Sequence, residues 1–397
     1  MKGVLPGRQF IRAWRDALRF YRRQDDASRI VFYSEDRSYE KYLGPIIRAL
    51  VEQEGEQLCY LSSDAADPIL KQNETVLRGG RDKPITSYYV GAGSARTFAF
   101  QTLRANILVM TMPDLETFHI KRSTVHPVHY AYVHHSMVST HMVYRGEAFD
   151  HFDSIFCVGP HHVEEIRAWE KLNGLPSKRL FEHGYAVLDW LLAAGREPGA
   201  QQLAGAPLNV LLAPSWGADS IIERGAEPLI QALLGAGYHV VVRPHSMTAR
   251  NSSAKLDQLS RSFRGAGQFV LDADTTTLRA LLDADVMISD WSGAAMEFAF
   301  GLGRPVLFLD VPRKVNNPRW TEINITPLED FYRNEVGTIL DCRRPADAPA
   351  MIERLWKSSG AIAERANILR AKYVFNPGDS ASHGAKIIAD LARDRRR

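Results

Sequence analysis

Cysteine is scarce in this sequence. Its 397 residues include three cysteines, Cys59, Cys157 and Cys342, which lie far apart and show no CxxC spacing. This pattern predicts a reducing compartment and disfavours both a disulfide framework and a zinc knuckle. Long apolar runs are also missing: no stretch approaches the about 18 apolar residues of a membrane-spanning helix, and the N-terminus lacks the apolar segment of a signal peptide. We therefore expect a protein that is neither exported nor membrane-spanning.

The charge balance and several absent motifs exclude further classes of protein. The net charge of +3 is only mildly basic and gives little support for a nucleic-acid partner. No GxxxxGK[ST] motif occurs, which disfavours an ATPase or kinase of the P-loop type. HExxH is also absent, and although histidines cluster at 126–141 and 161–162, no acidic residue lies at ligand spacing from them. We therefore expect no metal centre.

Residues 1–28 predict an amphipathic, basic N-terminal helix. Its apolar residues recur at helical spacing, and its arginines occupy the remaining faces. The two sets are Phe10, Ile11, Trp14, Ala17, Leu18 and Tyr21, and Arg8, Arg12, Arg15, Arg19, Arg22 and Arg23. Such a pattern is typical of a helix that lies in an anionic membrane surface. The alternative is a helix docked on the protein's own core with a solvated basic face. The basic cluster RDRRR at 393–397 could act with this helix.

Beyond the first helix, strand-like and helix-like segments alternate twice along the chain, which predicts βαβ units and parallel sheets. A segment rich in Ala, Gly, Gln and Pro places a linker at 196–207. We therefore predict an α/β protein with two Rossmann-like, doubly wound parallel-sheet domains facing a central cleft. Residues 29–195 would form an acceptor domain and 208–375 a nucleotide-donor domain, followed by a C-terminal helix and basic tail at 376–397.

Three polar motifs follow predicted strands in the second half: LLAPSWG, VVVRPHS and MISDWSG. Because the carboxyl ends of parallel strands share one edge of a sheet, we expect the three motifs to form one ligand site. A helix that begins at 292–293 would direct its free N–H groups and positive dipole end at an anion. Hydroxyl, guanidinium and imidazole groups would stabilise a phosphoryl group. The candidate residues are Ser215, Arg243, His245, Ser289, Asp290, Ser292, Gly293 and Glu297.

Glu297 lies about one turn into the helix that begins at 292–293. At that position its carboxylate could accept hydrogen bonds from the vicinal hydroxyls of a ligand. The alternative interpretation is that Ser292 only caps the helix and that Glu297 is a surface carboxylate.

In the first half, the predicted strand HYAYVHHS ends in histidines. A histidine at a strand end is a natural general base for an attacking hydroxyl, because its ordinary pKa is about 6.5. His135 is the first candidate, and His134, Ser136 and His141 are further acceptor-side candidates. We expect His161 and His162, which follow Pro160 at the start of the next helix, to be surface or helix N-terminal residues and not ligands.

The ordered motifs resemble those of the CDP-glycerol glycerophosphotransferase family, which includes teichoic acid and capsule polymerases and primases with the GT-B fold. The resemblance rests on HHS near 135, APSW near 214, RPHS near 244, SDWSGAAME near 290, GRPVLFLD after it and the closing YVFNPGDSASHGAKII. It extends over residues 125–390. Where the family has a second serine, this sequence has Gly293.

By this resemblance, His135 would be the acceptor-side catalytic histidine, and His245 would contact the donor phosphates. Ser289 and Ser292 would bind phosphate, and Glu297 would hold the donor hydroxyls. The resemblance implies a cytoplasmic transferase on the inner face of the plasma membrane that uses CDP-glycerol or a related CDP-polyol and requires no cofactor. A hydroxyl of a lipid-linked or polymeric glycan, deprotonated by His135, would attack the β-phosphorus, and CMP would leave.

Two other functions fit the same residues. A GT-B glycosyltransferase would use the same scaffold and phosphate site with a nucleotide-sugar as its donor. A catalytically inactive, membrane-docked binding protein is favoured by the altered first motif, in which HHSMVST lacks the family's Gly, Pro and Lys. The nucleotide released from a panel of donors would discriminate among these functions.

Overall fold

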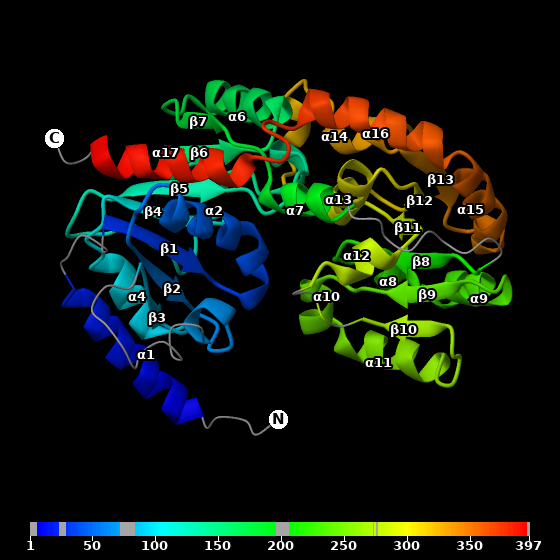
Figure 1. Cartoon of the computed structure of the whole chain (residues 1–397), viewed down its shortest axis with the longest axis horizontal. Helices are drawn as coiled ribbons and strands as arrows, with labels where there is room; N and C mark the ends of the chain where they lie inside the picture. Colours follow the sequence, from blue (N-terminus) through cyan, green and yellow to red (C-terminus); the bar gives the residue numbers. More distant parts are fainter. Residues whose placement is uncertain are drawn as a thin grey trace. The chain divides into compact units, whose positions relative to one another are not determined.

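Two parallel β-sheets with helices against their faces organise the chain (Figure 1). The computed structural model describes residues 6–23, 29–71, 84–195, 206–272, 274 and 277–394. The chain divides into two units. The first comprises Met1–His135, Arg145–Ala186 and Asp379–Arg397, and the second comprises Ser136–Tyr144 and Val187–Gly378. The predicted α/β class with two Rossmann-like parallel sheets is confirmed.

The first sheet has the strand order β3-β2-β1-β4-β5-β6-β7 in the described part of the chain, and its pairings are parallel. Its strands are β1 (Ile30–Ser34), β2 (Leu58–Ser62), β3 (Ile85–Tyr89), β4 (Ile107–Met110), β5 (His129–Val133), β6 (Ser154–Cys157) and β7 (Arg179–Glu182). The order reverses direction between β1 and β4. Parallel sheets bind ligands outside the carboxyl ends of the strands at such a switch point.

Helices at both ends of the sequence belong to the first unit. Its helices are α1 (Pro6–Tyr21), η2 (Arg37–Tyr39), α2 (Glu40–Glu52), α4 (Ser94–Gln101), α6 (Pro160–Asn173) and α17 (Ser380–Asp394). Helix α17 lies beside α2 (Figure 1), and its Ile388 is fully buried in one core with Leu50 and Phe32. The C-terminal helix, predicted as a separate segment at 376–397, is therefore an integral layer of the first unit.

The second sheet has the order β10-β9-β8-β11-β12-β13, again with parallel pairings. Its strands are β8 (Asn209–Leu212), β9 (His239–Val242), β10 (Phe269–Leu271), β11 (Val286–Ser289), β12 (Val306–Asp310) and β13 (Gly337–Asp341). The switch point lies between β8 and β11. These strands are nearly continuous in Val, Ile and Leu because helices cover both faces of the sheet.

The helices of the second unit connect and flank these strands. They are α5 (Thr140–Val143), α7 (Ala186–Gly195, which begins at the unit boundary), α8 (Ile221–Arg224), α9 (Glu227–Gly235), α10 (Ser246–Asn251), α11 (Ser253–Ser262), α12 (Arg279–Asp283), α13 (Gly293–Leu302), η3 (Trp320–Glu322), α14 (Leu328–Tyr332), η4 (Pro345–Asp347), α15 (Ala348–Lys357) and α16 (Ser359–Tyr373).

A short segment directly after β5, Ser136–Tyr144, belongs to the second unit. The Ser139 amide donates a hydrogen bond of 2.8 Å to the carboxylate of Glu329. The side-chain amide of Asn317 donates one of 2.9 Å to the His141 carbonyl. The sequence analysis had assigned this segment to the acceptor domain at 29–195. The structure instead separates Ser136 and His141 from His135, the last residue of the first unit before the crossing.

Some predicted features lie outside the described residues. The predicted linker at 196–207 does so except for its last two residues, as do the last three residues of the basic tail. Among the described helices, none is both long enough and apolar enough to cross a membrane.

The first testable prediction concerns α17. Replacing the buried Ile388 with Ala should lower the free energy of unfolding by about 2–5 kcal/mol, because it leaves a cavity between α17 and the sheet. The control is Lys386→Ala on the exposed side of the same helix, where the side chain is 69% exposed and the change should stay within about 0.5 kcal/mol. Chemical denaturation measures the free energy of unfolding of both variants. If Ile388→Ala is as stable as Lys386→Ala, α17 is not an integral part of the first unit.

Candidate functional site

The carboxyl edge of the second sheet is organised by Asp290, which follows β11 and is fully buried. Its Oδ1 accepts a hydrogen bond of 2.7 Å from the Ser215 amide, and its Oδ2 accepts one of 3.3 Å from the Ile221 amide. Burial raises the pKa of this carboxyl, and the bond from the Ser215 amide opposes that rise. Asp290 thus ties the loop after β8 to the end of β11 at the switch point, so its role is to position the site.

Ser289 is fully buried beside Asp290. Its hydroxyl donates a hydrogen bond of 2.7 Å to the carbonyl of Ala213, at the end of the neighbouring strand β8. The sequence predicts that this hydroxyl binds a phosphate. That contact would require the bond to Ala213, which holds two strand ends together, to be exchanged.

Arg243 follows β9 and is also turned inward. Its guanidinium donates a hydrogen bond to the Thr277 carbonyl and lies 3.8 Å from the carboxylate of Asp272, and the residue is 8% exposed. The predicted phosphate contact of Arg243 would therefore require these partners to be exchanged. The sequence could not reveal them, because both lie about 30 residues away along the chain.

Helix α13 begins where the sequence predicts it. The Ser292 hydroxyl accepts a hydrogen bond of 3.3 Å from the Ala294 amide and caps the helix. Ten residues of helix place the positive end of the dipole at this edge of the sheet. Glu297, on the same helix, is 7% exposed, so it is not the surface carboxylate of the alternative interpretation.

Gly293, the first residue of α13, has a steric explanation. A β-carbon at this position would meet the hydroxyl of Ser136 at far less than van der Waals distance, with Val138 3.5 Å away. The family that the sequence resembles has serine here. In this chain the segment that begins at Ser136 occupies the space that a side chain would need.

A histidine, a tryptophan and a lysine meet at the same edge. The Nδ1 atom of His245 accepts a hydrogen bond of 3.1 Å from the Met247 amide, so the neutral ring carries its proton on Nε2. The rings of His245 and Trp216 are 6.1 Å apart, and the Nζ atom of Lys314 lies 4.5 Å from the centre of the Trp216 ring. Trp216 follows β8, His245 follows β9 and Lys314 follows β12, so three strand ends build this group.

Lys314 is not among the residues that the sequence predicts for this site. The residue is half-buried, and burial lowers the pKa of its ammonium to about 8, while the Asp290 carboxylate acts in the opposite direction. The neighbouring Arg313 is neutralised by Asp330, at 2.8 Å. The sequence does carry a signal: the strand RPVLFLD is followed by VPRK, so a fourth strand end carries basic residues beside the three that were predicted to form the site.

In the first unit, His135 follows β5 and is half-buried. Its Nδ1 lies 2.9 Å from the Thr111 carbonyl and 3.0 Å from the Tyr132 hydroxyl. A carbonyl only accepts, so Nδ1 carries the proton and the lone pair is on Nε2, as a general base requires. The rings of Tyr39 and Tyr42 lie 5.7 Å and 6.1 Å from the His135 ring and form an aromatic wall beside it.

His134, the alternative base, points into the interior of the first unit. Its ring lies 4.0 Å from that of His162, and burial lowers its pKa well below the ordinary value. His161 and His162 are buried in the first turn of α6, so of the two positions expected for them they take the helix N-terminus and not the surface. Within the described residues, no group of three or more His, Cys, Asp or Glu side chains could hold a metal ion.

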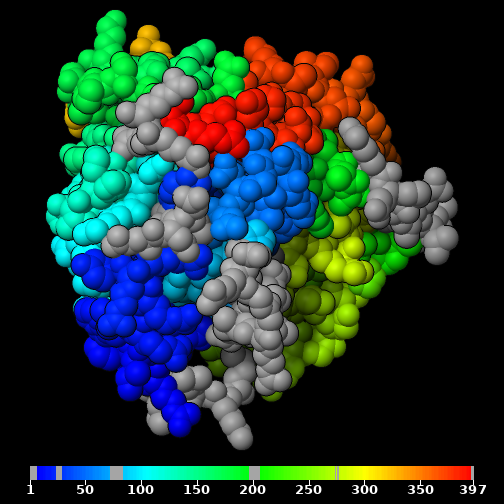
Figure 2. All heavy atoms as spheres, turned by 60° about the vertical axis from the view of Figure 1, so that its left-hand side comes forward, coloured from blue at the N-terminus to red at the C-terminus, as the bar shows by residue number. Residues whose placement is uncertain are grey.

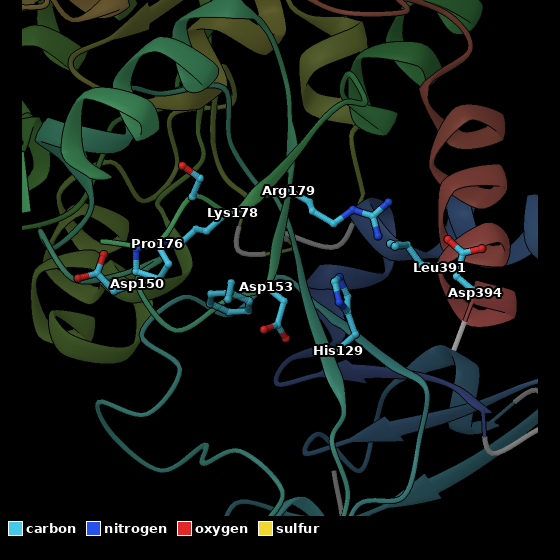
Figure 3. A pocket seen from close by; sticks show the side chains of 10 residues that line it. His129, Asp150, Asp153, Pro176, Lys178, Arg179, Leu391 and Asp394 are labelled. Atoms are coloured by element: carbon cyan, nitrogen blue, oxygen red, sulfur yellow. The ribbon is translucent and has the colours of Figure 1, made fainter. Parts of the chain in front are cut away.

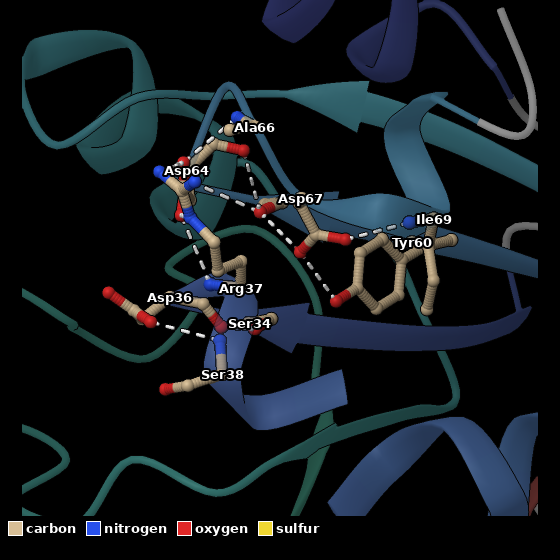
Figure 4. A network of polar contacts seen from close by, with 10 residues as sticks. Ser34, Asp36, Arg37, Ser38, Tyr60, Asp64, Ala66, Asp67 and Ile69 are labelled. Carbon is tan, nitrogen blue, oxygen red and sulfur yellow. Dashed lines mark hydrogen bonds and ion pairs between the residues drawn. The ribbon is translucent and has the colours of Figure 1, made fainter. Parts of the chain in front are cut away.

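A second polar network lies at the carboxyl ends of β1 and β2 (Figure 4). The carboxylate of the buried Asp67 accepts hydrogen bonds from the Tyr60 hydroxyl at 2.9 Å and the Ser62 hydroxyl at 2.8 Å, and Arg37 lies 2.7 Å from Asp64. Burial raises the pKa of Asp67. No residue of this network is among the predicted site residues, although YSED and LSSDAAD each span the carboxyl end of a strand.

A cavity of about 400 Å³ lies at the opposite edge of the first sheet, at the amino ends of β5, β6 and β7 (Figure 3). His129, Lys178 and Asp394 are among its lining residues. Internal partners hold two of these groups: His129 lies 2.9 Å from the Ser154 hydroxyl, and the Lys178 ammonium lies 3.7 Å from the Glu170 carboxylate. The cavity is remote from the strand ends at which parallel sheets bind ligands, so we assign it no catalytic role.

Comparison of the sequence with models of known protein families and with curated proteins gives no match. The structure, however, is similar to solved structures along nearly its whole length. UDP-GlcNAc 2-epimerase from Methanocaldococcus jannaschii matches with a TM-score of 0.55 and 12% identity over 92% of this chain and 99% of that one. A putative UDP-N-acetylglucosamine 2-epimerase from Listeria monocytogenes matches with a TM-score of 0.57 and 12% identity, over 93% of this chain and 96% of that one. A glycosyltransferase from Rickettsia africae matches with a TM-score of 0.53 and 9% identity, over 92% of this chain and 98% of that one.

These similarities define the class of structure: the chain has the GT-B fold of two Rossmann-like domains. The fold expected from the resemblance is therefore confirmed. Structural similarity at sequence identities near 10% establishes the fold but not the family. Membership of the CDP-glycerol glycerophosphotransferase family therefore stays a prediction.

The contact between Gly293 and Ser136 gives a second testable prediction. Gly293→Ala should lower the free energy of unfolding by about 1 kcal/mol or less, because the added methyl group forces the Ser136 hydroxyl to rotate out of its position. In a Ser136→Ala background the same substitution should cost less or become stabilising, since alanine is a better helix former than glycine. A double-mutant cycle by chemical denaturation measures the coupling. Independent, additive effects would contradict the steric explanation.

Proposed function

We propose that the protein is a GT-B transferase that binds a nucleotide-activated donor at the carboxyl edge of its second sheet. The observation that carries this proposal is the group formed by Trp216, His245 and Lys314 beside the start of α13. A diphosphate there would meet an ammonium, an imidazole N–H and the positive end of a helix dipole. The face of Trp216 would offer an apolar contact to the ring of a sugar or a base.

This set of groups suits the leaving side of a transfer reaction. Negative charge develops on the nucleotide phosphates as the bond to the donor breaks, and fixed positive groups stabilise that charge most effectively in a partly dry site. Asp290 contributes indirectly, because it holds the loop that carries Trp216 in place. In this scheme the donor itself supplies the reactive group, and no further cofactor takes part.

A nucleotide-sugar is the donor that we favour. The titles of two of the similar structures name UDP-GlcNAc 2-epimerases and a third names a glycosyltransferase, which supports a nucleotide-sugar in this fold. An acceptor hydroxyl would then attack the anomeric carbon, and the nucleoside diphosphate would leave.

A phosphopolyol donor of the CDP-glycerol type is the second candidate. The ordered motifs around His135, Ser215, His245 and Asp290 favour it. In that reaction the acceptor hydroxyl would attack the β-phosphorus and CMP would leave, so the donor that is consumed, together with the nucleotide that it releases, distinguishes the two candidates.

On the acceptor side, we propose that Nε2 of His135 removes the proton from the attacking hydroxyl. The hydrogen bond to the Thr111 carbonyl holds the ring in the required tautomer. The aromatic wall of Tyr39 and Tyr42 would contact the apolar face of a sugar ring. A lipid-linked or polymeric glycan is the acceptor class that we propose.

A donor panel tests the proposed function. The full chain is incubated with UDP-sugars, CMP-sugars, CDP-glycerol and CDP-ribitol, with and without a lipid-linked glycan, and the released nucleotides are separated by chromatography. Release of UDP or CMP from one donor, lost in a folded His245→Ala variant, is the expected result. Binding of a donor without turnover would favour the inactive binding protein. If the protein neither binds nor turns over any of these donors, the proposal is overturned.

Lys314 gives a third prediction. Lys314→Ala should weaken donor binding about tenfold or more, because a hydrogen bond to a charged group is lost. In the wild-type chain the ammonium is charged below its pKa of about 8, so donor affinity should fall as the pH rises through 8. Lys314→Arg should remove that fall because guanidinium stays charged. Calorimetric titration between pH 6.5 and about pH 9 measures the effect, and an identical pH profile in both proteins would contradict this role.

His135 gives a fourth prediction. His135→Ala should lower kcat by about 10²- to 10⁴-fold, the usual contribution of a general base, while the Kd of the donor stays unchanged. Steady-state kinetics with a saturating acceptor, together with donor titration, separates the two quantities. His134→Ala is the matched control for a buried neighbour. If folded His134→Ala loses more kcat than His135→Ala, then His135 is not the general base.

A further inference from the structure

Helix α1 leaves four large apolar side chains in solvent. Phe10, Ile11, Leu18 and Tyr21 are 59%, 68%, 39% and 40% exposed. We call these four residues the outer stripe. Their spacing places them on one side of the helix, and Figure 2 shows α1, in blue, at the surface. An exposed apolar stripe of this kind indicates a surface that another partner covers.

A different side of α1 holds the helix on the first unit. Ala13, Ala17 and Phe20 are buried, and the Phe20 ring lies 5.3 Å from the Tyr88 ring on β3. The buried Asp16 accepts a hydrogen bond of 3.4 Å from the Tyr89 amide. The helix therefore has an inner apolar side that is already occupied. Within the outer stripe, the Tyr21 ring also lies 5.4 Å from the Phe98 ring on α4, whereas Phe10 and Ile11 are more than half exposed.

This arrangement revises the sequence interpretation. The helical spacing of the six apolar residues predicts a single side of the helix that faces the membrane. The structure places Ala17 on the inner side, and the ring of Trp14 lies 5.6 Å from that of Phe98 on α4. The first alternative, a helix docked on its own core, is met on the inner side of α1, and the outer stripe is a second, exposed apolar side of the same helix.

The side of α1 next to the outer stripe is rich in arginine. Arg8, Arg15, Arg19 and Arg22 are exposed. The helix carries one acidic residue, Asp16, and its carboxylate lies 3.3 Å from Arg15 and 3.5 Å from Arg19. One carboxylate cannot neutralise this group, so the outer stripe is bordered by net positive charge.

We propose that α1 binds the surface of an anionic lipid bilayer, with the outer stripe inserted among the acyl chains and the arginines against the lipid phosphates. An apolar stripe beside guanidinium groups complements an interface that is apolar below and anionic above. A second copy of the chain fits less well, because pairing two outer stripes would bring two sets of arginines together. This proposal is independent of the proposed function, although it would bring the enzyme to a lipid-linked acceptor.

Vesicle sedimentation with the full chain tests the proposal. The protein should sediment with vesicles of phosphatidylcholine and phosphatidylglycerol, bind at least tenfold less to phosphatidylcholine alone, and dissociate as the salt concentration rises. Phe10→Ser with Ile11→Ser should abolish binding. The double variant Arg8→Gln with Arg22→Gln should bind anionic vesicles about tenfold or more less tightly, because each arginine charge contributes about fivefold to the affinity.

Matched controls keep the test decisive. Ile368→Ser removes an apolar side chain that is 62% exposed on α16 of the second unit, and it should leave binding unchanged. Circular dichroism and melting temperature verify that each variant is folded. Equal binding to neutral and anionic vesicles, or no binding to either, would overturn the proposal. A concentration-dependent dimer that the Phe10/Ile11 variant disrupts, with no vesicle binding, would assign the outer stripe to a second copy. Turnover of a soluble acceptor is measured in parallel, so failure here remains separate from failure of the proposed function.

Discussion

The carboxylate of Asp290 is buried at the point where β8 and β11 diverge, and the candidate donor site depends on it. It accepts hydrogen bonds from the Ser215 amide, in the loop that begins at the end of β8, and from the amide of Ile221, the first residue of α8 at the other end of that loop. Amides in a tight loop at a sheet edge have no strand partner, and leaving them unpaired in the interior would be costly. By satisfying both, Asp290 fixes the loop that carries Trp216, the ring over which Lys314 lies.

Positive charge at this edge is distributed unequally among the basic residues. Arg243 and Arg313 have acidic partners, Asp272 and Asp330, so their charges are largely compensated within the fold. Lys314 lies instead against an indole face, and burial lowers the pKa of its ammonium. A cation held against a ring and partly dehydrated is well placed to gain from an arriving phosphate, because it has less hydration to lose.

The terminal helices show how one sequence pattern can serve two purposes. Helix α17 directs its apolar side entirely into the core of the first unit, where Ile388 is fully buried. Helix α1 divides its apolar residues between Phe20 and its neighbours, which bind it to the fold, and an outer stripe that includes Phe10 and Ile11. Periodicity alone marks both helices as amphipathic. Which side meets the protein depends on the neighbours that the fold supplies.

The sequence by itself determined the α/β class, the start of α13 directly after its cap Ser292 and the order of the strand-end motifs. These features rest on periodicity and capping, which act over a few residues. The tertiary structure alone decided that Ser289 bonds Ala213, that Arg243 faces Asp272, that Ser136 excludes a side chain at Gly293, and that Lys314 joins the site. Each of these contacts joins residues about 30 or more positions apart, and no local pattern records which distant segment will occupy a given space.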